Sequence, residues 1–146
     1  MIVFGNVDFT GINVNGDFRM KQSQINGYAS INNIQVNENG SADFSLLNCK
    51  GDFNFKHCKI TGDVSFDYAS FSRNADFSYI AASGLSLIGT SVAGELSIDG
   101  ANLEKLLFRQ ELQNSGDSHA SIAKTMPKIF HLRKAIIRGY LDLSNL

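Results

Sequence analysis

Several features that would identify common protein classes are scarce in this sequence. Its 146 residues contain one proline, no tryptophan and two cysteines, and no apolar run is long enough to span a membrane. The N-terminus lacks the basic start and apolar core of a signal peptide, so we expect a cytoplasmic protein without a membrane span. The formal net charge of −1 supplies no global field for nucleic acid or an anionic membrane, and neither is expected as a partner.

Glycine and phenylalanine, by contrast, are abundant, with 13 and 11 copies. The chain length suits one domain. Segments that begin with glycine recur about every eleven residues, for example GDFRMKQSQIN at 16–26, GDFNFKHCKIT at 51–61 and GDVSFDYASFS at 62–72. Such a period predicts a repeat architecture, in which like segments stack on one another.

Each repeat contains two short apolar patterns of the same kind. An apolar residue is preceded, two positions earlier, by a second small or apolar residue, and the residue between them is nearly always polar, as in Ala42-Asp43-Phe44. This alternation predicts a very short strand with two inward side chains. A glycine stands four residues before many of the inward positions, where a corner needs either positive φ or close backbone approach. These glycines are Gly5, Gly16, Gly27, Gly40, Gly51, Gly62 and Gly94.

Four such steps make one coil of about 22 residues, so like positions should form vertical columns in a β-solenoid. Large aromatic residues dominate two columns and smaller residues the other two, a combination that would fill a rectangular core. The columns are Phe9, Ile31, Phe55, Phe77, Ile98; Val14, Val36, Ile60, Ala82, Leu103; Met20, Phe44, Phe66, Leu87; and Ile25, Cys49, Phe71, Val92.

Three triplets, Ala42-Asp43-Phe44, Ala75-Asp76-Phe77 and Ala101-Asn102-Leu103, resemble the A(D/N)LXX unit of pentapeptide-repeat proteins. The resemblance covers 4–104 and implies an all-β, right-handed, quadrilateral parallel β-helix of about 4–5 coils. Two features indicate a divergent branch with an eleven-residue unit. The steps alternate between five and six residues, and Phe or Ile often replaces the inward Leu.

The ladder of inward residues is interrupted after Glu104. We expect β-helix repeats over 1–104, a mostly α-helical or loop excursion or cap over 105–133, and a final partial coil over 134–146, all within one structural domain. Asp117 or Ser118 can cap a short helix through 120–123, and Pro127 can open a second helix through 128–132. These two helices are the only ones expected in the chain.

Charge divides at the same boundary. Residues 1–104 hold 6 basic and 11 acidic side chains, whereas 105–146 hold 7 basic and 3 acidic ones. The basic residues either keep the excursion solvated and docked on an acidic face or form a patch that binds an acidic partner. The partner-binding residues expected under the second hypothesis are Lys124, Lys128, Arg133, Lys134 and Arg138.

No arrangement of residues in the sequence has the spacing of a catalytic or metal site. Cys49 and Cys58 occupy inward positions and are expected to be core thiols, while His57 should point outward or lie in a corner. His119 and His131 are expected at the surface without catalytic partners. Carboxylates follow several corner glycines, at Asp17, Asp52, Asp63 and Glu95. No general acid, Arg clamp or Ca²⁺ loop accompanies them, so no enzyme activity, metal or cofactor is expected.

These observations predict a non-catalytic scaffold that binds a protein partner, with the basic irregular segment supplying the specific contact. The family resemblance implies an alternative, a DNA mimic that inhibits or protects a type II topoisomerase such as gyrase. A translocated bacterial effector is a third possibility. Because a β-helix exposes strand edges at its ends, we also expect either end-to-end homodimerisation through the N-terminal coil or, if the chain is a fragment, a preceding domain that covers this coil.

Overall fold

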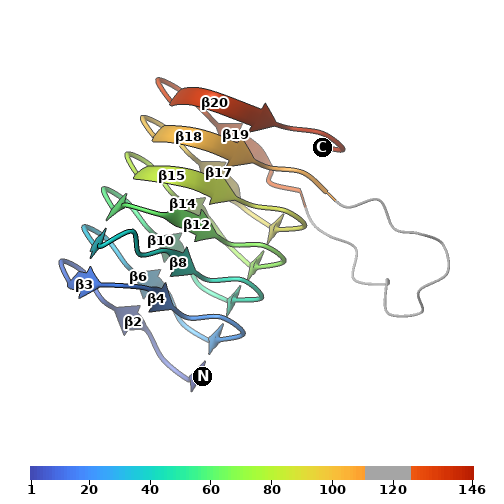
Figure 1. Cartoon of the computed structure of the whole chain (residues 1–146). Coiled ribbons are helices and arrows are strands. Elements are labelled where there is room, and N and C mark those ends of the chain that lie inside the picture. The colour runs from blue at the N-terminus through green and yellow to red at the C-terminus, as the bar shows by residue number, and fades with distance from the viewer. Residues whose placement is uncertain (111–125) are drawn as a thin grey trace, which may run out of the picture.

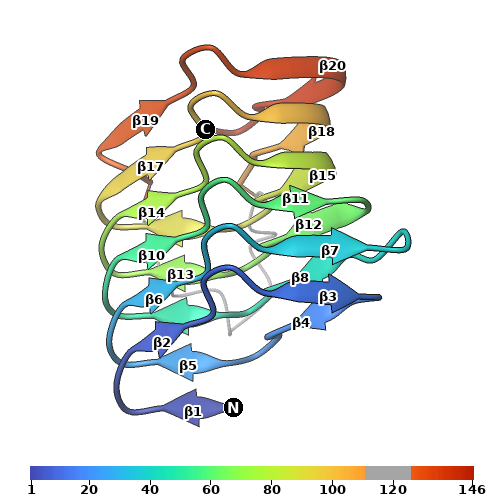
Figure 2. The same cartoon turned by 90° about the vertical axis from the view of Figure 1, so that its left-hand side faces the viewer.

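The computed structural model describes residues 1–110 and 126–146. All secondary structure in these residues is β-strand, and every strand pair is parallel. The strands stack into a solenoid of about five coils, with the N-terminus at one end and the last strand at the other (Figure 1). In Figure 2 the chain crosses the front from left to right as the coils rise, so the solenoid is right-handed. The predicted parallel β-helix is therefore confirmed.

The coils build three sheets, whose strands are as follows. Sheet A contains β1 (Ile2–Val3), β5 (Gln24–Ile25), β9 (Asn48–Cys49), β13 (Ser70–Phe71) and β16 (Ser91–Val92). Sheet B contains β2 (Val7–Asp8), β6 (Ala29–Ser30), β10 (Phe53–Asn54), β14 (Ala75–Asp76), β17 (Glu95–Ser97) and β19 (Ile129–His131). Sheet C contains β3 (Asn13–Asn15), β4 (Phe18–Arg19), β7 (Gln35–Asn37), β8 (Ala42–Asp43), β11 (Lys59–Ile60), β12 (Asp63–Ser65), β15 (Ala81–Ser86), β18 (Asn102–Leu107) and β20 (Ile136–Asp142).

Sheet C combines two faces of the solenoid that are separate in the first coils. Strands β11 and β12 are distinct, but both pair with the single strand β15 of the next coil, through Lys59 with Ala81 and Asp63 with Gly84. Three residues separate the paired positions in the earlier coil and two in the later one. The loss of one corner residue lets β15 run through both faces, and β18 keeps this spacing. Strand β20 also follows both faces, but with one residue more between the paired positions, at an irregularity in the register.

The predicted inward columns form the core. The registers align Asp8 with Ser30 and Arg19 with Asp43, which brings the inward residues next to them into the predicted columns. Phe66 lies at the centre of the aromatic cluster, with its ring centroid 4.6 Å from those of both Phe44 and Phe77. All three rings are fully buried.

At five of the seven predicted corner glycines, all but Gly5 and Gly16, close approach between coils rather than positive φ favours glycine. A Cβ on Gly40 would lie 2.1 Å from the Gly16 oxygen, and one on Gly51 would lie 2.6 Å from the Gly27 oxygen. Of the seven predicted corner glycines, Gly16 alone has a positive φ. The left-handed conformation occurs at other corners, in a column that includes His57 and Tyr79.

The ladder extends beyond Glu104 and resumes before 134. Strand β18 reaches Leu107, and the inward pair Leu106 and Phe108 is fully buried. The helix predicted over 128–132 is wrong: this segment contains β19, which pairs with β17. Phe130 and Leu132 repeat the inward alternation of the ladder, and pairing of their backbone with the preceding coil outweighs the local helix signal. The helix predicted over 120–123 lies outside the described residues.

The final coil, defined as residues 126–146, confirms that the ladder resumes near the C-terminus. Strand β20 pairs with β18 along both faces of sheet C, with an irregularity in register after Leu103. Over 1–110 and 126–146 no helix could serve as a membrane span.

Candidate functional site

Strand β20 of the final coil departs from the pattern of outward residues in the other coils. In the column that ends at Ile136 the preceding outward residues are Asn13, Gln35, Lys59, Ala81 and Asn102. In the column that ends at Tyr140 they include Asp63, Gly84 and Lys105. Large apolar or aromatic side chains therefore stand on β20 where the coils below carry polar or small ones.

Both replacements are exposed, with 54% of Ile136 and 58% of Tyr140 open to solvent. Because their side chains point outward from the sheet, a further coil stacked on β20 would not cover them. The sequence prediction did not include these two residues. A signal for them was present, because Ile136 immediately precedes an inward position, where the ladder normally has a polar residue.

Arg138 lies between the two on the same strand. Its Nη1 donates to Asn102 Oδ1 at 2.5 Å and lies 3.8 Å from Glu104 Oε1 in the coil below. These contacts hold the guanidinium over β18, and the side chain remains about half exposed. The outer face of β20 thus presents Arg138 between Ile136 and Tyr140. Arg138 is one of the residues predicted to bind a partner.

Arg133 makes a stronger contact with the coil below. Its Nη2 and Nε donate to Asp99 Oδ2 at 2.8 and 3.0 Å, and its backbone N–H donates to Asp99 Oδ1. Burial raises the pKa of Asp99, but the hydrogen bonds from Arg133 outweigh this effect and hold the pKa below its usual value. Arg133 therefore secures the final coil to its neighbour.

The remaining basic residues of the predicted patch are separated from Arg138. Lys128 precedes β19, where its N–H donates to Gly94 O, and Lys134 occupies a corner with φ of 57°. Neither has an ion-pair partner among residues 1–110 and 126–146. Lys124 lies outside the described residues. The four described cations are distributed around the final coil, with Lys128 before β19, Arg133 and Lys134 between β19 and β20, and Arg138 on β20.

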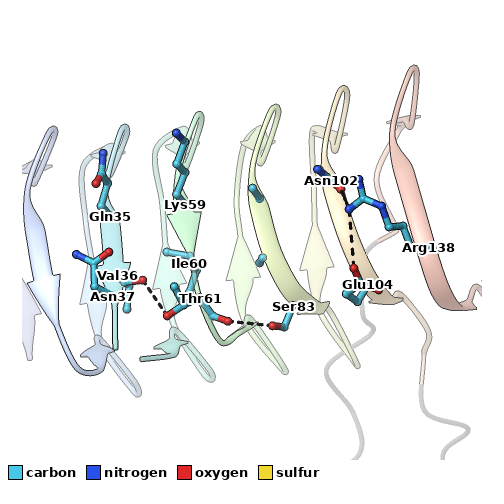
Figure 3. Close-up of a pocket in the computed structure, with 12 residues that line it drawn as sticks. Gln35, Val36, Asn37, Lys59, Ile60, Thr61, Ser83, Asn102, Glu104 and Arg138 are labelled. Carbon is cyan, nitrogen blue, oxygen red and sulfur yellow. Dashed lines mark hydrogen bonds and ion pairs between the residues drawn. The ribbon is translucent and has the colours of Figure 1, made fainter. Parts of the chain in front are cut away.

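A shallow groove of about 440 Å³ crosses the outer face of sheet C next to Arg138. Figure 3 shows Gln35 and Lys59 on one side and Asn37, Thr61 and Ser83 on the other. The Thr61 hydroxyl donates to Val36 O at 3.2 Å and the Ser83 hydroxyl to Thr61 O at 3.0 Å. Both hydroxyls donate to backbone carbonyls of the solenoid, so neither is free to act on a ligand in the groove.

The recurring aspartates have structural roles at corners. Asp8, Asp43, Asp76 and Asp142 each accept a backbone N–H from the residue two positions later, at 2.9 Å in every case. Such bonds stabilise turns. The hydrogen bonds from Thr10 lower the pKa of Asp8, as those from Ser144 lower the pKa of Asp142.

Both cysteines are free and fully buried in the core, as predicted. Burial raises the pKa of the Cys58 thiol to about 11 and also raises the pKa of Cys49. His57 lies in a corner, as predicted, and stacks on Tyr79 with ring centroids 4.9 Å apart. His131 lies 3.6 Å from Glu95, whereas His119 is outside the described residues. Across the described part of the chain no three potential metal ligands gather.

Comparison with known proteins gives no relative from which a function could be transferred. No protein-family model, curated protein or solved structure matches this chain. Its function must be inferred from its own geometry, in which the exposed apolar groups on β20 are the clearest departure from the repeat.

Proposed function

We propose that the protein is a non-catalytic scaffold that binds a protein partner through the outer face of β20. The observation that carries this proposal is the exposure of Ile136 and Tyr140 at positions where the preceding coil has Asn102 and Lys105. Exposed apolar and aromatic side chains that an architecture does not require indicate a binding surface. Tyrosine is also among the residues that most often dominate binding energy.

Charge defines the kind of partner. Arg138 lies between the two apolar groups, and Lys134 stands at the corner that precedes the strand. A complementary surface has a carboxylate opposite Arg138 and an apolar group on each side of it, and a further carboxylate can face Lys134. The basic residues predicted from sequence thus contribute from the final coil, with Lys134 and Arg138 nearest the apolar groups and Arg133 largely occupied by Asp99.

The carboxylates of the solenoid support a binding role over a catalytic one. Four aspartates at corners accept backbone N–H groups, which commits one oxygen of each carboxylate to the fold. The same corner roles, together with paired lysines such as Lys56 and Lys105, weaken the case for DNA mimicry. A DNA mimic needs a dense array of unpaired carboxylates that replaces the phosphates.

We further propose that the solenoid is of the pentapeptide-repeat type. Each face carries two inward residues separated by one outward residue, as in Ala75-Asp76-Phe77, with the inward pair buried. The corner residue that is lost between β11 and β15 accounts for the shorter spacing in β15 and β18.

The test replaces the two apolar residues by the residues of the preceding coil. The double variant Ile136→Asn, Tyr140→Lys should fold normally, because β18 already carries Asn102 and Lys105 at these positions. A partner captured by the wild-type chain from extracts of the source cells is purified, and its dissociation constant is measured by calorimetry. We expect the double variant to bind at least about tenfold more weakly.

The matched control replaces two outward residues of the middle coils by the residues of the coil that precedes them. Asn48→Gln and Lys59→Gln introduce the residues of the preceding coil and should leave binding unchanged. Equal loss in both double variants, or loss in the control alone, would contradict the proposal. Light scattering measures whether β20 binds a second copy of the chain instead of a different protein. If the two apolar residues support self-association alone, the proposal is also contradicted.

A further inference from the structure

The corner between sheets A and B contains a second departure from the repeat. Glycine occupies this corner in four coils, at Gly5, Gly27, Gly51 and Gly94, but the coil between the last two has Arg73. A Cβ at Gly27, Gly51 or Gly94 would lie less than 3.0 Å from backbone atoms of the coil below. Glycine is therefore the residue that the architecture favours, and Arg73 occupies the corner in its place.

The backbone hydrogen bonds of the corner are kept at Arg73. The N–H of Gly27 donates to Gly5 O at 3.0 Å, that of Gly51 to Gly27 O at 2.9 Å, and that of Gly94 to Arg73 O at 3.2 Å. In the described part of the chain the Arg73 side chain itself makes no hydrogen bond or ion pair. The contacts within the coils thus give no structural reason for the arginine.

Arg73 lines a hollow of about 310 Å³ together with Lys50 and Tyr28. The register of β9 with β13 pairs Cys49 with Phe71, so Lys50 and the segment that leads to Arg73 belong to adjacent coils. Neighbouring coils lie about 4.8 Å apart. Two cations from adjacent coils thus flank one hollow, and Tyr28 contributes a half-exposed phenol ring.

The acidic residue at the hollow does not neutralise these cations. Asp52 Oδ1 accepts the backbone N–H of Asn74 at 3.2 Å, which commits one carboxylate oxygen to the corner. Within residues 1–110 and 126–146 neither Lys50 nor Arg73 has a carboxylate within 4.0 Å, whereas Lys56, Lys105 and Arg133 all do. The hollow therefore keeps a net positive charge, and both cations belong to its lining.

We propose that this hollow is a binding site for a phosphate or phosphate-monoester anion. The planar guanidinium of Arg73 can donate two parallel hydrogen bonds to the phosphate oxygens, and the Lys50 ammonium adds a point charge. Tyr28 also lines the hollow, and its hydroxyl can add a third donor while its ring can pack against a group esterified to the phosphate. The site lies on sheets A and B and does not depend on the proposed role of β20.

The test uses Arg73→Gly, which restores the residue of the other coils and should fold at least as well as the wild type. Inorganic phosphate and phenyl phosphate are titrated separately at constant ionic strength, while ¹H–¹⁵N spectra of the full chain are recorded. We expect saturable shifts centred on Gly27, Gly51 and the Arg73 Nε–H. Binding should weaken at least about tenfold in Arg73→Gly, because a charge-assisted donor pair is lost.

The matched control, Lys21→Gln, removes one exposed cation at a distant turn and should leave the affinity unchanged. Tighter binding of phenyl phosphate would identify an esterified ligand, and equal binding of the two probes would identify the free anion. Both results support a phosphate site. Shifts that do not saturate, or that are equal in the wild type and Arg73→Gly, would overturn the proposal.

Discussion

Replacement of Phe66 by alanine is expected to lower the free energy of unfolding by about 3–5 kcal/mol, the range typical of a fully buried aromatic residue. Phe66 is fully buried, and its ring centroid lies within 6 Å of those of Phe44, Phe53, Phe55, Phe71 and Phe77. These rings come from three successive coils. The cavity would therefore weaken contacts both above and below the coil that contains Phe66.

The loss is measured by urea unfolding followed by far-UV circular dichroism. Phe4→Ala is the matched control, because 86% of Phe4 is exposed and its truncation should change stability by no more than about 0.5 kcal/mol. A loss below about 1 kcal/mol for Phe66→Ala would mean that the stacked aromatic core is not the main source of stability.

Replacement of Gly40 by alanine is expected to lower the free energy of unfolding by about 3 kcal/mol, the upper part of the usual range for overpacked sites. The added Cβ would lie 2.1 Å from Gly16 O and 2.8 Å from Asn37 O, both of them backbone atoms. Relief of these clashes requires the two coils to separate at a corner. The hydrogen bonds of Gly40 N to Asn37 O and of Gly62 N to Gly40 O would then be strained.

Gly5→Ala provides the comparison for this change. A Cβ on Gly5 meets nothing within 4 Å, and its φ is not positive, so the same substitution should leave the unfolding transition nearly unchanged. Both variants are compared by urea unfolding under identical conditions. Similar transitions for the two would show that contact between coils does not select glycine at the corners.

The body of the solenoid could be predicted from the sequence because each inward position carries a local signal. The residue pair Ala75 and Phe77, with Asp76 between them, is readable without knowledge of any other coil. Stacking repeats that signal at a fixed period, so the registers follow from the alignment of like positions. Burial of Cys49 and Cys58 followed from the same reasoning.

The later coils were less predictable because their spacing changes. Between Lys59 and Asp63 the chain turns a corner, whereas β15 passes the equivalent point with one residue fewer, and the sequence does not display this merger of faces. At 128–132 the helix signal of Pro127 concealed the inward pair Phe130 and Leu132. Local propensity was overridden there by pairing with β17.

The candidate site could be predicted only in part for a related reason. Lys134 and Arg138 were identified by charge alone, which does not show that Arg138 lies between two exposed apolar groups. Ile136 and Tyr140 became evident once the register placed them in columns with polar residues. In both proposed sites a residue departs from what stacking of the coils favours, which is expected where function opposes architecture.

Hydrogen exchange of the full chain, with and without its purified captured partner, tests the central claim most directly. Amide exchange reports which backbone segments become protected on binding. The account predicts slower exchange over 134–142, with no change in β6, β10 and β14 on the middle of sheet B. Protection centred on those middle strands, or none over 134–142, would contradict the assignment of β20 as the binding surface.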